Sequence, residues 1–195
     1  MLDKIREMAR NGQREEAKRQ AEELVRRFPE FAPARAFAAN LFYQSGKKDE
    51  AIKELERYIA LAPSPDPADY LSLALWLEQR NGPQDHEEAI KFLDVAIVKF
   101  GEVVRLQQLA VKLECRLGKY DSALRRVDAL VTQYQPSPAY SLMRADIHEA
   151  AGNFQEAARA CDSAVALLDL ESTPGGLKNP VRESIIQRRD GNLAK

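Results

Sequence analysis

Hydrophobic and polar positions along this chain repeat with the period of an α-helix. Apolar residues recur every three or four positions, and glycine or proline interrupts the pattern at regular intervals. The pattern predicts helices over residues 1–9, 14–28, 34–44, 49–61, 68–80, 87–100, 103–117, 121–134, 139–151, 155–168 and 181–189. The sequence therefore indicates an all-α protein in which short helices follow one another along the chain.

A glycine is followed five residues later by an alanine at four places in the chain. These pairs are Gly12 and Ala17, Gly46 and Ala51, Gly118 and Ala123, and Gly152 and Ala157, with Gly82 and Ala89 as a longer version. Glycine can end a helix in a left-handed turn, and alanine lets the next helix approach the first closely. Most of these alanines lie 34 residues apart, and the central step is 38 residues. A fixed period of this length is typical of stacked helical hairpins.

The repeat spacing predicts five hairpins and a C-terminal extension. The hairpins cover residues 1–30, 31–65, 66–102, 103–136 and 137–170. Residues 171–195 are expected to form a loop, a short helix that caps the end of the stack, and a frayed tail. The longer central period is expected to arise from the proline link 64–67 and from an expanded turn over Asn81–His86.

Residues at fixed places in the repeats carry a resemblance to a known family. They are Ala39, Gly46, Ala51, Leu55, Tyr58 and Pro63 in repeat two, Gly118, Tyr120, Ala123 and Leu130 in repeat four, and Ala145, Gly152, Phe154, Ala157 and Ala164 in repeat five. In these residues the chain resembles the tetratricopeptide repeat family over residues 1–170. The resemblance implies a right-handed α/α superhelix, a solenoid of about five helical hairpins with a capping helix. It also implies a concave face, lined by the first helix of each hairpin, where a protein or peptide partner binds.

Counting back from each glycine gives the side chains expected on that concave face. The candidate groove residues are Asn40, Tyr43, Gln44, Trp76, Gln79, Arg80, Gln108, Lys112 and Arg116, and the same count adds Asp146 and Glu149 from repeat five. Trp76 has two interpretations, a core residue packed between hairpins or an aromatic anchor for a peptide. The basic members would suit an acidic side chain or a C-terminal carboxylate. The carboxylate clamp of some family members is not favoured, because Ala36, Leu73 and Leu109 stand where polar residues would be needed.

The charge balance narrows the classes of partner. Lysine and arginine number 29 against 30 acidic residues, which gives a net charge of −1 and argues against nucleic acid and membrane surfaces as partners. The N-terminal segment lacks the apolar run of a signal peptide or a membrane span. We therefore expect a cytoplasmic protein without direct membrane insertion, or a domain excised from a larger or envelope-associated protein.

Catalytic chemistry is not indicated by the sequence. Cys115 and Cys161 lie in separate helices and predict no disulfide. His86 is expected at the surface in the expanded turn, and His148 is expected to pack within a helix. Cys115 is expected to face the groove one repeat away from His148, but no third group that would orient them is evident. The sequence predicts no enzyme, no metal site and no cofactor.

Two functions remain open after this interpretation. The first is a scaffold or adaptor that binds a peptide segment or helix of a protein partner on its concave face. The alternative is an architectural segment of a larger secretion or envelope-assembly complex, which associates through its ends or by self-association as a homo-oligomer. An RNA-reading helical repeat is disfavoured by the acidic balance of the chain.

Overall fold

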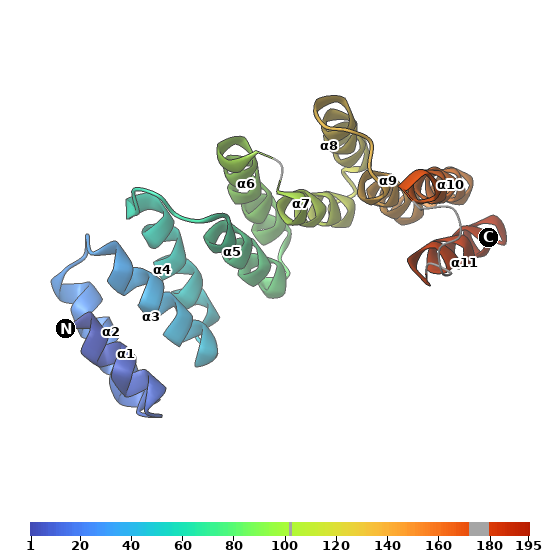
Figure 1. Ribbon diagram of the computed structural model, residues 1–195. Coiled ribbons are helices and arrows are strands. Elements are labelled where there is room, and N and C mark those ends of the chain that lie inside the picture. The colour runs from blue at the N-terminus through green and yellow to red at the C-terminus, as the bar shows by residue number, and fades with distance from the viewer. Residues whose placement is uncertain (102, 172–179) are drawn as a thin grey trace. The chain divides into compact units, whose positions relative to one another are not determined.

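The helices begin and end close to the glycines and prolines that interrupt the hydrophobic pattern. The computed structural model describes residues 1–101, 103–171 and 180–195, which form eleven helices and no strand (Figure 1). The helices are α1 (Leu2–Arg10), α2 (Arg14–Arg27), α3 (Ala32–Gln44), α4 (Lys48–Leu61), α5 (Pro67–Arg80), α6 (Pro83–Phe100), α7 (Val104–Arg116), α8 (Tyr120–Gln133), α9 (Pro138–Ala150), α10 (Phe154–Glu171) and α11 (Pro180–Leu193). The predicted all-α architecture is confirmed.

Two units divide the helices. The first, Met1–Phe100, contains the pairs α1–α2, α3–α4 and α5–α6, and the second, Gly101–Lys195, contains α7–α8 and α9–α10 followed by α11. Within each unit the second helix of one pair also packs on the first helix of the next pair, as α2 does on α3, α4 on α5 and α8 on α9. Each hairpin therefore buries an apolar face against its neighbour in the same unit.

The repeated alanines lie at the closest contacts between paired helices. Ala17, Ala51, Ala89, Ala123 and Ala157 all have an exposed fraction of 0%. Each lies in the first half of the second helix of its pair, where a larger side chain would force the two helix axes apart. The predicted role of the alanine in the repeat is therefore supported by its burial in all five hairpins.

Four of the five turns share one backbone conformation. Gly12, Gly46, Gly118 and Gly152 have φ angles of 83°, 78°, 69° and 77°, in the left-handed region. The N–H of the residue after each glycine donates to a carbonyl five residues earlier, with distances of 3.0, 2.9, 2.8 and 2.8 Å for Gln13, Lys47, Lys119 and Asn153. This bond satisfies a carbonyl that the helix end would otherwise leave unpaired. The glycines thus fix the direction in which each second helix leaves the first.

The third hairpin departs from the prediction. Asn81, with a φ angle of 63°, takes the left-handed position, and α6 begins at Pro83 and not at Glu87. Proline is well suited to a first helical turn, and the Asp85 carboxylate accepts a hydrogen bond of 3.3 Å from the Gly82 N–H. The predicted expanded turn over Asn81–His86 was wrong because residues 83–86 belong to α6 and leave only Asn81 and Gly82 between the helices. His86 is consequently buried, with an exposed fraction of 6%, and does not lie at the surface.

Buried ion pairs connect the two helices of some hairpins. Arg35 of α3 bonds to Glu54 of α4 at 2.5 Å, and Arg126 of α8 bonds to Glu114 of α7 at 2.8 Å. Both members of each pair are largely removed from solvent, so either charge would be costly to bury without the other. The pairs therefore favour one register of the second helix on the first.

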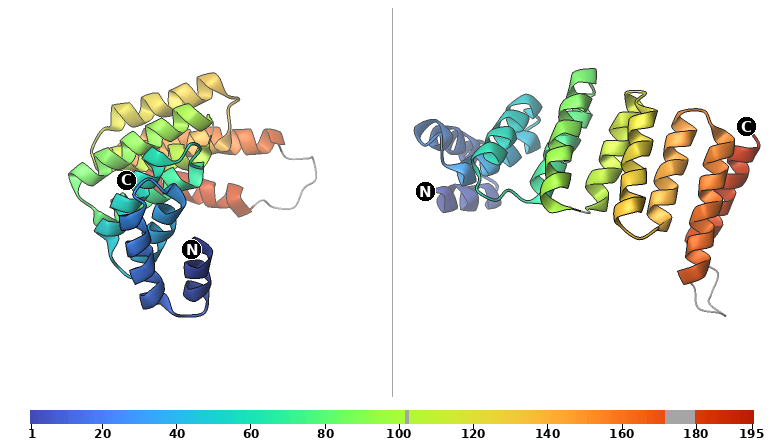
Figure 2. Two further views of the ribbon diagram at one scale, coloured as in Figure 1. Left: turned by 90° about the vertical axis from the view of Figure 1, so that its left-hand side faces the viewer. Right: turned by 90° about the horizontal axis from the view of Figure 1, so that it is seen from above.

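Helix α11 covers the end of the C-terminal unit. It lies beside α10 (Figure 2), and Ile185 joins a buried cluster formed by Ala145, Ala160, Cys161 and Ala164. Ile185 is buried, whereas Val181 on the same helix remains exposed. The capping contact thus depends on one isoleucine and on polar contacts beside it.

The C-terminal residues continue α11 instead of fraying. The helix runs to Leu193, and Asn192 is buried and donates to the Glu149 carboxylate at 2.6 Å. The predicted frayed tail is therefore mostly helical, and that prediction was wrong up to Leu193. The loop predicted between the last hairpin and the capping helix lies largely outside the described residues.

Ala123→Leu should lower the free energy of unfolding by about 1–3 kcal/mol, because the added atoms overpack the contact between α7 and α8. Ala129→Leu is the matched control, since Ala129 lies exposed on the same helix. Urea denaturation followed by circular dichroism measures both. Equal stability of the Ala123→Leu variant and the parent would show that this alanine is not at a close contact.

The docking of α11 should depend on pH through Glu149. Burial acts to raise the pKa of this carboxyl, but hydrogen bonds from Arg188 and Asn192 outweigh it and hold the pKa below its ordinary value of 4.5. The ionised carboxylate therefore contributes stability at pH values above 4.5, and this contribution is lost as the pH falls through the lowered pKa. The stability difference between the parent and Glu149→Gln, on the order of 1 kcal/mol for a partly exposed pair, should be present at pH 7 and vanish in acid. A difference that is independent of pH would contradict this.

Candidate functional site

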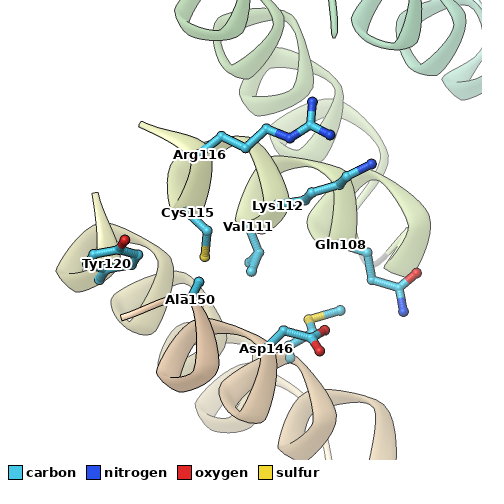
Figure 3. A pocket seen from close by; sticks show the side chains of 9 residues that line it. Gln108, Val111, Lys112, Cys115, Arg116, Tyr120, Asp146 and Ala150 are labelled. Carbon is cyan, nitrogen blue, oxygen red and sulfur yellow. The ribbon is translucent and has the colours of Figure 1, made fainter. Parts of the chain in front are cut away.

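A cavity of about 490 Å³ lies between α7 and α9, the first helices of two successive hairpins in the C-terminal unit. Its lining residues are Gln108, Val111, Lys112, Cys115, Arg116 and Tyr120 from the fourth hairpin and Met143, Asp146 and Ala150 from α9 (Figure 3). We call it the α7–α9 cavity. Three of the predicted groove residues, Gln108, Lys112 and Arg116, are thus brought together around one hollow.

The α7–α9 cavity has an apolar floor and a polar rim. Val111 and Met143 are buried at its base, and Figure 3 shows Val111 and Cys115 pointing from α7 toward α9. The charged ends of Lys112 and Arg116 extend away from α9 in the same view. A bound group would therefore meet hydrocarbon and sulfur in the cavity and positive charge beside it.

The spacing of residues on α7 explains this division. Val111 and Cys115 are four residues apart and share one face of the helix, and Lys112 and Arg116 share the adjacent, exposed face. Leu113 is fully buried on a third face. A single helix therefore supplies hydrophobic core, cavity floor and cationic rim.

Burial and nearby acidic residues make the cysteine of the cavity a poor nucleophile. Burial raises the pKa of the Cys115 thiol, and together with the negative charges of Glu114 and Asp146 it brings this pKa to about 11. Asp146 is itself bonded to Arg188 of α11 at 2.5 Å. The thiol is thus protonated at neutral pH and acts as part of the apolar floor.

The aromatic candidates of the N-terminal unit contact one another. The Tyr43 and Trp76 rings stack with their centroids 4.3 Å apart and an interplanar angle of 11°, and the Tyr43 hydroxyl donates to the Gln79 side-chain oxygen at 2.9 Å. Trp76 has an exposed fraction of only 7%. Of its two interpretations, packing between α3 and α5 is the one that this burial favours.

The remaining candidates of the N-terminal unit occupy two further places. Arg80 bonds to Asp49 of α4 at 3.0 Å and to Asp85 of α6 at 2.8 Å, so its charge is already neutralised within the unit. Asn40 and Gln44 line a second hollow, of about 350 Å³, which lies along α1 and α3. Within the N-terminal unit the candidates thus make different contacts, and each group is considered by itself.

Sequence reasoning placed Cys115 on the groove face but missed Val111 and Met143, the two buried residues in the floor of the α7–α9 cavity. Val111 and Met143 follow the hydrophobic period and would be assigned to the core from the sequence alone. The available signal was the four-residue spacing of Val111 and Cys115 next to a glycine that ends the helix. Asp146, in contrast, was placed on this face by counting back from Gly152.

The part of the chain that the structure describes offers neither a candidate metal site nor a candidate membrane-spanning helix. No group of three or more histidine, cysteine, aspartate or glutamate residues there could hold a metal ion. Among the same residues, no helix is both long and apolar enough to span a bilayer.

Comparison with protein families identifies the repeat. A tetratricopeptide repeat model matches residues 2–66 and 109–174, which is more than half of the chain. The chain belongs to the tetratricopeptide repeat family. The residues that carried the resemblance in repeats two, four and five lie within the matched regions. The third hairpin, where α6 starts early, lies mostly between them.

Several solved structures share this fold at low sequence identity. MamA is 15% identical with a TM-score of 0.67, and the match covers 92% of this chain and 96% of MamA. YrrB, described as a tetratricopeptide repeat protein with an unusual peptide-binding site, is 14% identical with a TM-score of 0.63 over 86% of this chain and 84% of YrrB. PilW, described as a type IV pilus biogenesis factor, is 13% identical with a TM-score of 0.56 over 99% of this chain and 84% of PilW. No curated protein sequence matches significantly.

The raised pKa of Cys115 predicts slow alkylation at neutral pH. In a Cys161→Ala background, the rate of reaction with iodoacetamide should rise about tenfold per pH unit and level off only near pH 11, because only the thiolate reacts. Mass spectrometry of timed aliquots gives the rate. Asp146→Asn removes a neighbouring negative charge and should shift the curve to lower pH. A plateau already reached at pH 9 would contradict the buried, acidic surroundings assigned to this thiol.

Proposed function

We propose that residues 1–170 form a tetratricopeptide repeat array that acts as a protein–protein interaction scaffold, and that the α7–α9 cavity binds a peptide segment or helix of the partner. Tetratricopeptide repeats generally mediate protein–protein interactions and generally are not enzymes. The observation that carries the proposal is the open apolar cavity beside two exposed cationic side chains. Rigid helices on both sides hold it in a fixed shape.

The chemistry of the cavity suggests which partner it takes. Its floor of Val111, Met143 and Cys115 suits one branched or aromatic side chain, which would lose its contact with water on entering. Lys112 and Arg116 beside the floor would attract a carboxylate next to that anchor in the partner sequence. We therefore expect a peptide that carries an apolar residue with an acidic residue close to it.

The fold of YrrB is consistent with this proposal, since YrrB is described as having a peptide-binding site. At 14% identity the likeness extends to the fold alone. The support for a site in this chain therefore comes from its own lining residues and not from the relative.

A second candidate function is architectural association through α11. Val181 and Leu193 expose 55% and 63% of their surface near the two ends of this helix, and exposed apolar residues can contribute to an interface. PilW, one of the proteins with this fold, is described as a pilus biogenesis factor. Light scattering separates the candidates, because a concentration-dependent dimer that is lost in a Val181→Asp/Leu193→Asp variant would favour this second function.

Peptides selected from a random display library against the full chain test the first function. Ala150→Trp should weaken their binding about tenfold or more, because the indole ring fills the cavity from its rim. Lys112→Glu/Arg116→Glu should weaken the binding of peptides that carry an acidic residue beside the apolar anchor, because like charges then repel one another. Fluorescence anisotropy of labelled peptides gives the dissociation constants.

Matched variants control for loss of folding and for net charge. Ala129→Trp adds the same ring on an exposed site of α8, and Arg125→Glu/Arg159→Glu makes the same charge change on exposed sites of α8 and α10. Neither control should change peptide affinity by more than about twofold. An equal loss of peptide affinity in the controls, or no loss in Ala150→Trp, would show that the peptides bind outside the cavity.

A further inference from the structure

The hollow along α1 and α3, which we call the α1–α3 groove, is strongly basic. Three arginines, Arg6, Arg10 and Arg14, line its volume of about 350 Å³ together with the amides of Asn40 and Gln44. No acidic residue is among its lining residues in the described part of the chain. The groove therefore carries positive charge and many hydrogen-bond donors. This contrasts with the protein as a whole, whose net charge is −1.

The residues of the groove are placed by helical spacing. Arg6 and Arg10 lie one turn apart on α1, and Arg14 is the first residue of α2. Asn40 and Gln44 lie one turn apart on α3, on the opposite side of the hollow. Positive charge on one side and amides on the other thus border the same space.

Arg6 is held in place by contacts within the unit. Its guanidinium lies over the Phe37 ring, 6.0 Å from the centroid, and it pairs with the exposed carboxylate of Asp3 at 3.2 Å. These contacts leave the long side chain less conformational freedom to lose when a ligand binds. Arg6 therefore contributes a partly ordered cation to the groove.

Arg10 and Arg14 differ from most arginines and lysines around them. Among the residues that the structure describes, no carboxylate lies within the 4 Å of an ion pair from either guanidinium, whereas Lys18, Arg19 and Arg27 on the neighbouring helix α2 each pair with a glutamate. An anion that enters the groove therefore meets two guanidinium groups that have no ion-pair partner among the described residues.

We propose that the α1–α3 groove binds an acidic peptide segment, with side-chain carboxylates paired to Arg10 and Arg14. Guanidinium groups present parallel N–H donors that match the two oxygens of a carboxylate, and side-chain amides can donate to the same oxygens. Asn40 also donates to the Ala36 carbonyl at 2.9 Å, which orients its amide. This groove shares no lining residue with the α7–α9 cavity, and the proposal does not depend on what that cavity binds.

The groove fits a short acidic segment better than a nucleic acid. Nucleic-acid binding generally uses a basic stripe along the protein, and the balanced charge of this chain provides none. Phe37, Leu41 and Ala9 supply apolar surface between the charged groups, which suits the carbon chains of glutamate side chains. A peptide with two or more glutamates in succession is therefore the expected ligand.

Anisotropy of a fluorescein-labelled hexaglutamate peptide, titrated with the full chain at low salt, tests the proposal. Arg10→Glu/Arg14→Glu should weaken binding about tenfold or more, because attraction is replaced by repulsion at both positions. Arg10→Lys/Arg14→Lys keeps the charge and should stay within a few-fold of the parent. Affinity of the parent should fall as salt rises, since exposed charges are screened.

The matched control is Arg26→Glu/Arg57→Glu, which makes the same charge change at exposed sites of the same unit outside the groove. An equal loss of affinity in this control would overturn the assignment, since it would show attraction to the net charge alone.

Equal binding of a hexaglutamine peptide would also overturn the assignment of the groove to carboxylates. Competition by a phosphoserine peptide at far lower concentration than hexaglutamate would overturn the choice of carboxylate in favour of phosphate. Ala150→Trp should leave hexaglutamate binding unchanged, so failure here is distinguishable from failure of the cavity proposal.

Discussion

The close approach of two helices at a buried alanine is the contact on which the rest of this structure depends. Five alanines in equivalent places are completely removed from solvent, and each lies just beyond a turn that sets the direction of the second helix. Because no hairpin of this size can bury its apolar face alone, the tight crossing has to be followed by stacking on the next hairpin. That stacking leaves the exposed faces of the first helices open for other contacts. The α7–α9 cavity and the α1–α3 groove both lie on such first helices, within their separate units.

Most of the fold follows from local rules that can be applied to the sequence. Glycine in the left-handed region, alanine five residues later and a 34-residue period predict the hairpins, because each rule concerns residues close together in the chain. The start of α6 was missed because the repeat rule assigns the left-handed position to glycine. Asn81 takes that position instead, and the local signals of Pro83 and Asp85 start the helix there. The length of α11 was missed because Asn192 is held by Glu149, a partner more than forty positions earlier in the chain.

The candidate site was predictable only in part, for a different reason. Lys112 and Arg116 follow from the register of α7, but the cavity beside them depends on which side chains of α9 face it. Met143 looks like an ordinary core residue in the sequence, and Arg10 falls in a short first helix that gives little sign of a groove. Trp76 shows the opposite case. Its large aromatic ring suggests an anchor for a peptide, but in the structure the ring packs on Tyr43 within the unit. Contacts between helices decide these roles, and the hydrophobic period does not record them.

The methyl groups of the methionines offer the most direct test of the central claim, that the α7–α9 cavity receives a partner side chain. Of the three methionines, Met143 lines the cavity, while Met8 lies on α1 in the other unit and serves as an internal control. NMR spectra of the full chain carrying ¹³C-methyl methionine can be recorded during titration with a display-selected peptide. Our account predicts a saturable shift of the Met143 methyl resonance with little change at Met8. A Met143 resonance that does not move when the peptide is fully bound would contradict it.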